Sequence, residues 1–170
     1  MNADELRALQ APFKARYRDE PASAFMTLRA KGDLAGTGVT CKVDTGKALI
    51  EAGLHPATGG DSSATCAGEM LLEALAACAG VTLRAVATAL EIPVRGGQVL
   101  VEGDLDFRGT LAVSKEAPVG FKAMRLRFEL DTDASAEQIE TLKKLTERYC
   151  VVFQTLKNPP PINLSLKVPE

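Results

Sequence analysis

The stretch GEMLLEALAACAGVTLRAVATAL, from Gly68 to Leu90, decides the fold predicted for this chain. Only Glu69, Glu73 and Arg84 carry charge in it, so a helix over these residues is apolar on nearly all sides. Such a helix is normally buried on most of its surface. The sequence therefore predicts a long central helix, packed closely through its many alanines and Gly80.

Short alternating segments on both sides of this helix predict strands. Residues 25–31, 38–44 and 47–51 precede it, and residues 98–107 and 121–130 follow it as a hairpin with a long loop. Alternation predicts that each hairpin strand turns one apolar face inward: Val99, Val101, Leu105 and Phe107 in the first, and Met124, Leu126, Phe128 and Leu130 in the second.

A second helix is expected over residues 135–150, where Ser135 and Gln138 fit a capping box. Its apolar stripe is predicted to comprise Ile139, Leu142, Leu145 and Tyr149, with Cys150 at its end. Apolar and polar side chains alternate again over residues 162–168, and this pattern predicts a final strand. This order of elements indicates an α+β fold with a largely antiparallel sheet. So few elements cover a long apolar helix poorly, and an intertwined homodimer would cover it better.

The 170 residues suit one compact domain. We expect a helical leader over residues 1–24, broken near Pro12, and a single domain over residues 25–170. The net charge of −2 favours neither nucleic acid nor an anionic membrane surface. The leader lacks the apolar run of a secretory signal, and Glu73 and Arg84 interrupt the best candidate for a membrane span, so we expect a cytoplasmic protein.

The four cysteines should be reduced in that compartment. None lies in a C-x-x-C pair and His55 is the only histidine, so we predict no metal site. Free cysteines are usually inert core residues, and Cys41 fits that description. Cys66, just before a helix N-terminus, is equally compatible with a reactive thiolate or a small buried residue.

Cys78 and Cys150 matter as a pair, because each belongs to a helical segment of the same expected core. If they meet, one thiolate can attack a peroxide and the other can resolve the sulfenic acid as a disulfide. Periodicity and composition do not show whether they meet.

Several pieces of the chain, in the same order, resemble the OsmC/Ohr family of osmotically inducible and organic hydroperoxide resistance proteins. They are GGDSSATCAGEMLLEALAACAGVTL, EIPVRGGQVLVEGDLDFRG, APVGFKAMRLRFEL and LTERYCVVFQTLKNPPPINLSL. The resemblance spans residues 25–168, and the ordered set is more specific than any single piece.

The resemblance implies an OsmC-like fold: a homodimer with swapped strands, whose mostly antiparallel sheets wrap around long central helices. It also implies a thiol-dependent peroxidase that reduces organic hydroperoxides, is regenerated by an external dithiol and needs no cofactor. Cys78 would be the peroxidatic thiol and Cys150 the resolving thiol. Glu69 and an arginine from the N-terminal strands, for which Arg29 is the nearest match, would assist.

Cys66 and the long leader depart from the family pattern, and Cys66 could compete as a resolving thiol. Glu69 and Cys78 are nine residues apart on an ideal helix, about 13 Å in rise and on opposite faces. Glu69 would therefore act on a partner subunit's thiol or only by positioning an arginine. Two alternatives stay open: a binding or redox-responsive relative without turnover, and a hotdog-type thioesterase using Glu69, Glu73 or His55.

Overall fold

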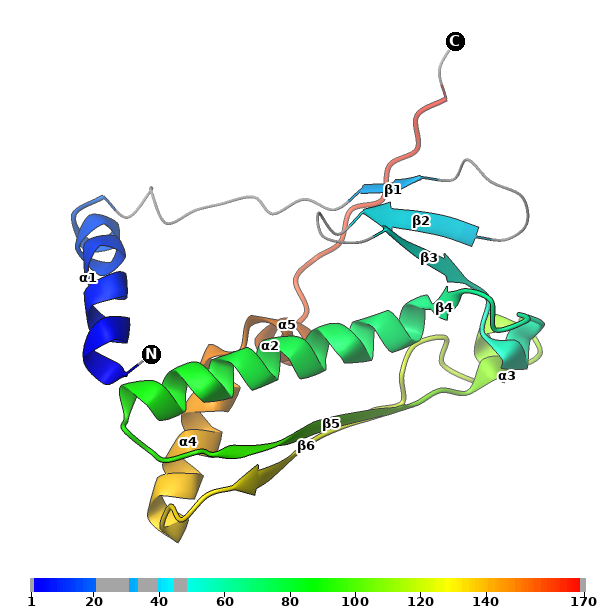
Figure 1. Ribbon diagram of the computed structural model, residues 1–170. Coiled ribbons are helices and arrows are strands. Elements are labelled where there is room, and N and C mark those ends of the chain that lie inside the picture. Colours follow the sequence, from blue (N-terminus) through cyan, green and yellow to red (C-terminus); the bar gives the residue numbers. More distant parts are fainter. Residues whose placement is uncertain (1, 21–30, 34–39, 45–48, 169–170) are drawn as a thin grey trace.

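The computed structural model describes residues 2–20, 31–33, 40–44 and 49–168. Along the chain the elements are α1 (Ala3–Asp19), β1 (Lys31–Asp33), β2 (Thr40–Asp44), β3 (Leu49–Gly53), the 3-10 helix η2 (Pro56–Thr58), β4 (Thr65–Cys66), α2 (Ala67–Ala89), β5 (Gly96–Asp104), α3 (Phe107–Thr110), β6 (Ala123–Asp131), α4 (Ala136–Tyr149) and α5 (Val151–Lys157). Helix α2 is the longest element and lies along the β5–β6 hairpin (Figure 1).

The leader is one continuous helix, so the predicted break at Pro12 is wrong. Proline removes one backbone donor, but a capping box between Asn2 and Glu5 fixes the start of α1. Ala3 is 7% exposed, and Arg7 lies 3.5 Å from Glu91 just beyond the end of α2. The leader therefore docks at the C-terminal end of α2. The division into residues 1–24 and 25–170 stays a prediction.

The N-terminal strands form a four-stranded sheet in the order β1-β2-β3-β4. Strands β1 to β3 pair antiparallel, with Val43 opposite Ile50, and β4 adds parallel to β3. Residues 25–30 of the first predicted strand lie outside the described residues. Within the described part of the chain, no extensive contact joins β1, β2 or β3 to the helices or to the β5–β6 hairpin; β4 makes the connection to α2.

Helix α2 confirms the prediction made from residues 68–90, but its burial is one-sided. Leu75, Ala79, Leu83 and Ala87 recur every four residues and form the buried stripe. At Gly80 an added Cβ would lie 3.3 Å from a methyl of Val99, so glycine allows close packing on β5. Val81 is 72% exposed. The prediction that α2 is buried on most sides is therefore wrong for the described residues of one chain, which bury only one face of this helix.

By length and composition, α2 is the one described helix that could cross a membrane, with a mean hydropathy of 1.6. Glu73 and Arg84 do not exclude this by themselves. A core helix of a soluble fold has the same composition, so the criterion is weak evidence for a membrane span. The absence of a membrane partner stays a prediction.

Strands β5 and β6 form the predicted antiparallel hairpin, with Val99 opposite Phe128 and Val101 opposite Leu126. Alternate residues of β6 are exposed, and the predicted inward face, Met124 to Leu130, is the more buried one. The prediction that Leu105 and Phe107 belong to the inward face of the first hairpin strand is wrong, because β5 ends at Asp104 and Asp106 caps α3.

Helix α4 starts with the predicted capping box, and Leu142 on its buried face is 1% exposed. Tyr149 is 58% exposed, so its assignment to the buried stripe is wrong. Thr146 takes that place, because it lies between Leu142 and Cys150 at spacings of four residues. At Cys150 the backbone becomes extended, and α5 starts in a new direction.

The predicted strand over residues 162–168 has no pairing partner among the described residues. The segment extends away from α5 toward the C-terminus (Figure 1). Its four alternating apolar side chains are 89 to 90% exposed: Ile162, Leu164, Leu166 and Val168. A strand needs a neighbour for its backbone hydrogen bonds, and the described part of the chain does not supply one here.

Candidate functional site

Cys78 and Cys150 come together where α2 meets the junction of α4 and α5. Cys150 is 1% exposed and packs with Leu75 and Ala79 of α2, and the half-buried Cys78 lies against the same cluster. Both thiols are free. A hydrogen bond between the two side chains contributes to the pKa of each. The structure therefore brings Cys78 and Cys150 together, which the sequence alone did not establish.

The environment of Cys78 favours its thiolate. Burial by itself raises the pKa of this thiol, but hydrogen bonds from the backbone N–H of Val152, from Cys150 and from the N–H of Val151 outweigh burial and lower it. These backbone groups belong to the first turn of α5, where N–H groups have no partner within the helix. The start of α5 therefore stabilises negative charge on the sulfur of Cys78.

The Thr82 side chain is the last and smallest of the hydrogen-bonding groups that lower the pKa of Cys78. It lies one turn beyond Cys78, and its hydroxyl donates to the backbone carbonyl of Cys78 at 2.8 Å. A hydroxyl has a single hydrogen to donate, so that bond directs it away from the sulfur. This confirms the expectation that a helical threonine bonds its own backbone.

The pKa of the Cys150 thiol is shifted in the opposite direction. Burial raises the pKa of its thiol more than the N–H of Phe153 lowers it, and the neighbouring Cys78 raises it further. Cys150 therefore stays protonated while Cys78 ionises, and it donates its S–H to the Cys78 thiolate. Such a pair consists of a nucleophile and a protonated neighbour that is positioned to react second.

Of the other two predicted site residues, the structure describes only Glu69, and it is not brought to this pair. Glu69 is exposed in the first turn of α2, nine residues before Cys78, and the straight helix separates them by about 13 Å. Arg29 lies outside the described residues. The roles given to Glu69 and Arg29 stay predictions.

Cys66 lies at the start of α2 and lines a separate cavity of about 380 Å³ together with His55. His55 accepts a hydrogen bond from the N–H of Ala57 through Nδ1 at 3.0 Å, and its ring stacks on Phe107. The histidine is thus fixed within its own turn, apart from the thiol pair. Within the described ranges, no group of three or more His, Cys, Asp or Glu side chains forms a potential metal site.

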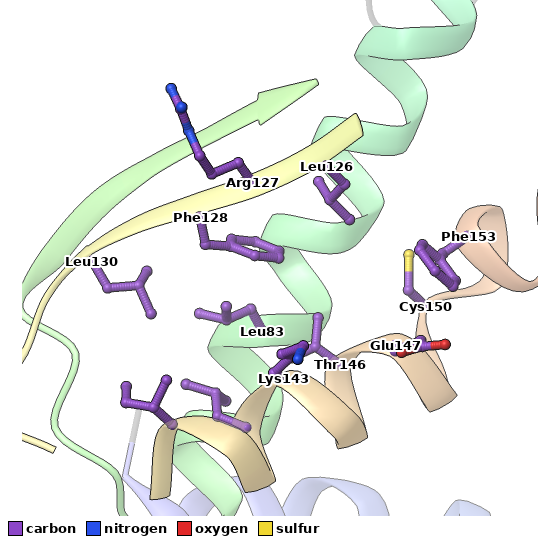
Figure 2. A pocket seen from close by; sticks show the side chains of 12 residues that line it. Leu83, Leu126, Arg127, Phe128, Leu130, Lys143, Thr146, Glu147, Cys150 and Phe153 are labelled. Atoms are coloured by element: carbon purple, nitrogen blue, oxygen red, sulfur yellow. The ribbon is translucent and has the colours of Figure 1, made fainter. Parts of the chain in front are cut away.

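A second cavity, of about 400 Å³, adjoins the thiol pair on the side of Cys150 (Figure 2). Side chains of α2, β6 and α4 enclose it, with Leu130 at one end and Cys150 beside Phe153 at the other (Figure 2). Most of its lining is apolar, but Thr146 and the charged residues Arg127, Lys143 and Glu147 also line it. The sequence reasoning missed Thr146, and its only signal was its position midway between Leu142 and Cys150.

Comparison with known proteins identifies this architecture. The family model described as OsmC-like protein matches residues 59–165. The OsmC-like protein from Mycoplasma pneumoniae superposes with a TM-score of 0.65 at 17% identity, covering 79% of this chain and 91% of that one. An organic hydroperoxide resistance protein OsmC from Legionella pneumophila superposes with a TM-score of 0.61 at 20% identity, covering 79% and 92%.

A third structure, a putative organic hydroperoxide resistance protein from Vibrio cholerae with captopril bound in one of its active sites, superposes with a TM-score of 0.53 at 18% identity. It covers 80% of this chain and 89% of that one. At such identities the superpositions show the fold alone. Comparison with curated proteins gives no match.

The fold and the site define an α+β protein with a paired-cysteine site against the middle of a long central helix. The chain belongs to the OsmC-like protein family, because the family model matches more than half of its length.

Proposed function

We propose that this protein is a thiol peroxidase that reduces organic hydroperoxides to alcohols. The Cys78 thiolate attacks the terminal peroxide oxygen, which breaks the O–O bond and releases the alcohol after proton uptake. Cys78 is then a sulfenic acid. Cys150 attacks its sulfur, forming the Cys78–Cys150 disulfide and releasing water. The hydroperoxide is reduced by two electrons, and the two thiols are oxidised by two.

The observation that carries the proposal is the packing of Cys78 against the buried cluster that contains Cys150, where the pKa values of the two thiols are shifted in opposite directions. A lowered pKa makes Cys78 the nucleophile at neutral pH, and a raised pKa keeps Cys150 protonated until the sulfenic acid has formed. The organic hydroperoxide resistance proteins among the similar structures support the same reaction class.

An apolar environment favours hydroperoxides with an organic substituent over hydrogen peroxide. Leu75 is buried beside the pair, and Phe153 packs against the same cluster. The two sulfurs supply the electrons themselves, so this proposal requires no metal, flavin or haem. It requires an external dithiol to reduce the disulfide, and it places the protein in the cytoplasm.

We further propose that the working unit is a homodimer. The exposed face of α2 around Val81, the unpaired segment over residues 162–168 and the poorly anchored β1–β3 strands are surfaces that a second copy would cover. Exposed apolar areas of this kind mark association sites. In a dimer, Glu69 would reach the thiol pair of the partner subunit or position an arginine, for which Arg29 is the candidate.

The proposal is tested by following hydroperoxide loss in the reduced protein with cumene hydroperoxide and a dithiol. We expect turnover in the native chain, none in Cys78→Ser, and a trapped sulfenic acid on Cys78 in Cys150→Ser. Full activity of Cys78→Ser would refute the assignment. The alternative prediction, a small-molecule-binding or redox-responsive relative without turnover, would show no catalytic loss of hydroperoxide when the dithiol is supplied.

A further inference from the structure

The cavity beside Cys66 is separate from the thiol pair. Its volume is about 380 Å³, and neither Cys78 nor Cys150 lines it. Cys66 precedes Cys78 by twelve residues, which places the two about 18 Å apart along α2. Cavities of roughly 300 to 1,000 Å³ hold small organic molecules, so this cavity is large enough for a ligand of its own.

Two loops enclose this cavity at the end of the molecule where β4 and α3 lie (Figure 1). One loop joins β3 to β4 and contributes His55, and the other follows β5 and contributes Phe107. The rings of His55 and Phe107 stack with their centroids 4.9 Å apart, which connects the two loops. The second loop is tightly folded, because a Cβ on Gly109 would lie 2.5 Å from the carbonyl oxygen of Pro118. The cavity walls are therefore fixed by contacts within the fold.

The lining of the cavity favours an apolar and uncharged ligand. Leu54, Leu111 and Val119 line it and are exposed to solvent, so an apolar molecule would remove their surface from water. Asp106 contributes the only carboxylate among the described residues that line the cavity. Arg108 donates to both of its oxygens, at 2.9 and 2.6 Å, and lowers the pKa of Asp106 to about 2. The ionised carboxylate disfavours an anionic ligand, and its pairing with Arg108 leaves little attraction for a cation.

His55 offers such a ligand a hydrogen-bond donor. Its Nδ1 accepts from the backbone N–H of Ala57 at 3.0 Å, so in the neutral ring the proton lies on Nε2. None of the described residues accepts a hydrogen bond from this Nε2–H group. A ligand oxygen can therefore accept it, and a carbonyl oxygen is an uncharged acceptor of the right kind.

Cys66 adds a nucleophile to the same cavity. Its thiol is free, and its side chain takes no part in capping α2. Gly68 leaves space beside the sulfur: a Cβ there would lie 3.6 Å from Sγ of Cys66 and 3.6 Å from the ring of Phe121. Addition of a thiol to a conjugated carbonyl compound needs two groups, a sulfur for the β-carbon and a donor for the oxygen that gains negative charge. Cys66 and His55 are such a pair.

We propose that this cavity binds an uncharged α,β-unsaturated carbonyl compound with an apolar chain, and that Cys66 adds to it. The sulfur forms a bond to the β-carbon, the carbon–carbon double bond becomes single, and the thiol proton reaches the α-carbon through solvent. His55 donates its Nε2–H to the carbonyl oxygen during the addition. The product is a thioether, and the step needs no oxidant or reductant. The inference is independent of the proposed peroxidase, because neither Cys78 nor Cys150 takes part.

The first test compares trans-2-nonenal with trans-2-pentenal on the full-length reduced protein, each corrected for its rate with N-acetylcysteine. The adducts are fixed with borohydride and located by mass spectrometry. Trypsin followed by a glutamate-specific protease separates Cys66 from Cys78, because Glu69 and Glu73 lie between them. We expect the longer aldehyde to add faster at Cys66, by about two- to fourfold for each added methylene. Equal corrected rates, or the same ratio in urea-unfolded protein, would overturn the proposal.

The second test concerns the donor on His55. His55→Gln keeps an N–H close to the position of Nε2, whereas His55→Asn keeps only an acceptor close to the position of Nδ1. Both variants lose the ring that stacks on Phe107, so they differ mainly in the donor. We expect nonenal to add to Cys66 about three- to tenfold more slowly in His55→Asn than in His55→Gln, the equivalent of one hydrogen bond. Equal rates in the two variants would show that His55 does not act as the donor.

A third measurement separates this site from the thiol pair. Cys66→Ala should abolish the rapid phase of nonenal addition and leave the oxidation of Cys78 by cumene hydroperoxide unchanged, which a general structural defect would not allow. Rapid addition that persists in Cys66→Ala would place the reactive thiol elsewhere and overturn the proposal. A native protein that does not consume hydroperoxide but still adds nonenal at Cys66 would refute only the peroxidase proposal.

Discussion

Replacing Cys150 should change the reactivity of Cys78, because Cys150 donates a hydrogen bond to its thiolate. Cys150→Ala removes the donor, and Cys150→Ser keeps an O–H in nearly the same place. A hydrogen bond to a charged group contributes about 1.5 to 3 kcal/mol. Since Cys78 is half-buried and partly screened by water, we use the lower end. At 1.36 kcal/mol for each tenfold change, the thiolate population at a fixed acidic pH falls about tenfold.

The assay is alkylation by iodoacetamide at about pH 6, where the rate follows the thiolate fraction, with the Cys78 peptide quantified by mass spectrometry. We expect a rate about tenfold lower in Cys150→Ala and a rate closer to the native one in Cys150→Ser. Cys66→Ala, at a thiol outside the pair, is the control and should leave the rate unchanged. A Cys150→Ala rate equal to or above the native rate would show that the N–H groups of α5 alone hold the thiolate.

Three further predictions follow from burial and exposure. Thr146→Val should raise the free energy of unfolding by about 1 kcal/mol in urea titration, because a methyl group replaces an unpaired buried hydroxyl; a loss of stability would show that the hydroxyl is bonded. Leu142→Ala should lower the free energy of unfolding by about 3 kcal/mol, since Leu142 is 1% exposed, and the exposed Thr141→Ala should stay within about 0.5 kcal/mol. The double variant Leu164→Lys and Leu166→Lys should sediment as a monomer while the native chain sediments as a dimer, and a dimeric variant would exclude residues 162–168 from the interface.

Local patterns in the sequence predicted most of the elements because their causes are local. The apolar composition of residues 68–90 is enough to specify α2, and strict alternation specifies the inward face of β6. The Ser135 capping box marks the start of α4 from side chains three residues apart. Tyr149 was predicted to be buried and Thr146 was overlooked because an aromatic residue is more often buried than a threonine. Spacing along the helix decides their burial instead. The side chains of Leu142, Thr146 and Cys150 share a face whatever their polarity.

The sequence could identify the two cysteines of the candidate site but not the groups that give them different reactivity. Val151 and Val152 act on Cys78 through backbone N–H groups, which carry no signature in side-chain patterns. Those groups are available only because the chain becomes extended at Cys150 and restarts a helix. Neither glycine nor proline marks that break. Its cause is tertiary, since Cys150 is buried against Leu75 and Ala79 of α2.

The geometry of α2 keeps the proposed dimer compatible with an open cavity beside Cys150. Leu83 lines the cavity, and Val81 is two residues earlier, about 200° around the helix. Ala74 is nine residues from Leu83 and lies about 180° away. A second copy packed on the face of Val81 and Ala74 would therefore leave the Leu83 side open. Consequently, if dimerisation proceeds through that face, the rate at which a small apolar alkylating reagent reacts with Cys150 should stay the same when the protein is diluted from dimer to monomer, and a higher rate in the monomer would show that the second copy covers the cavity.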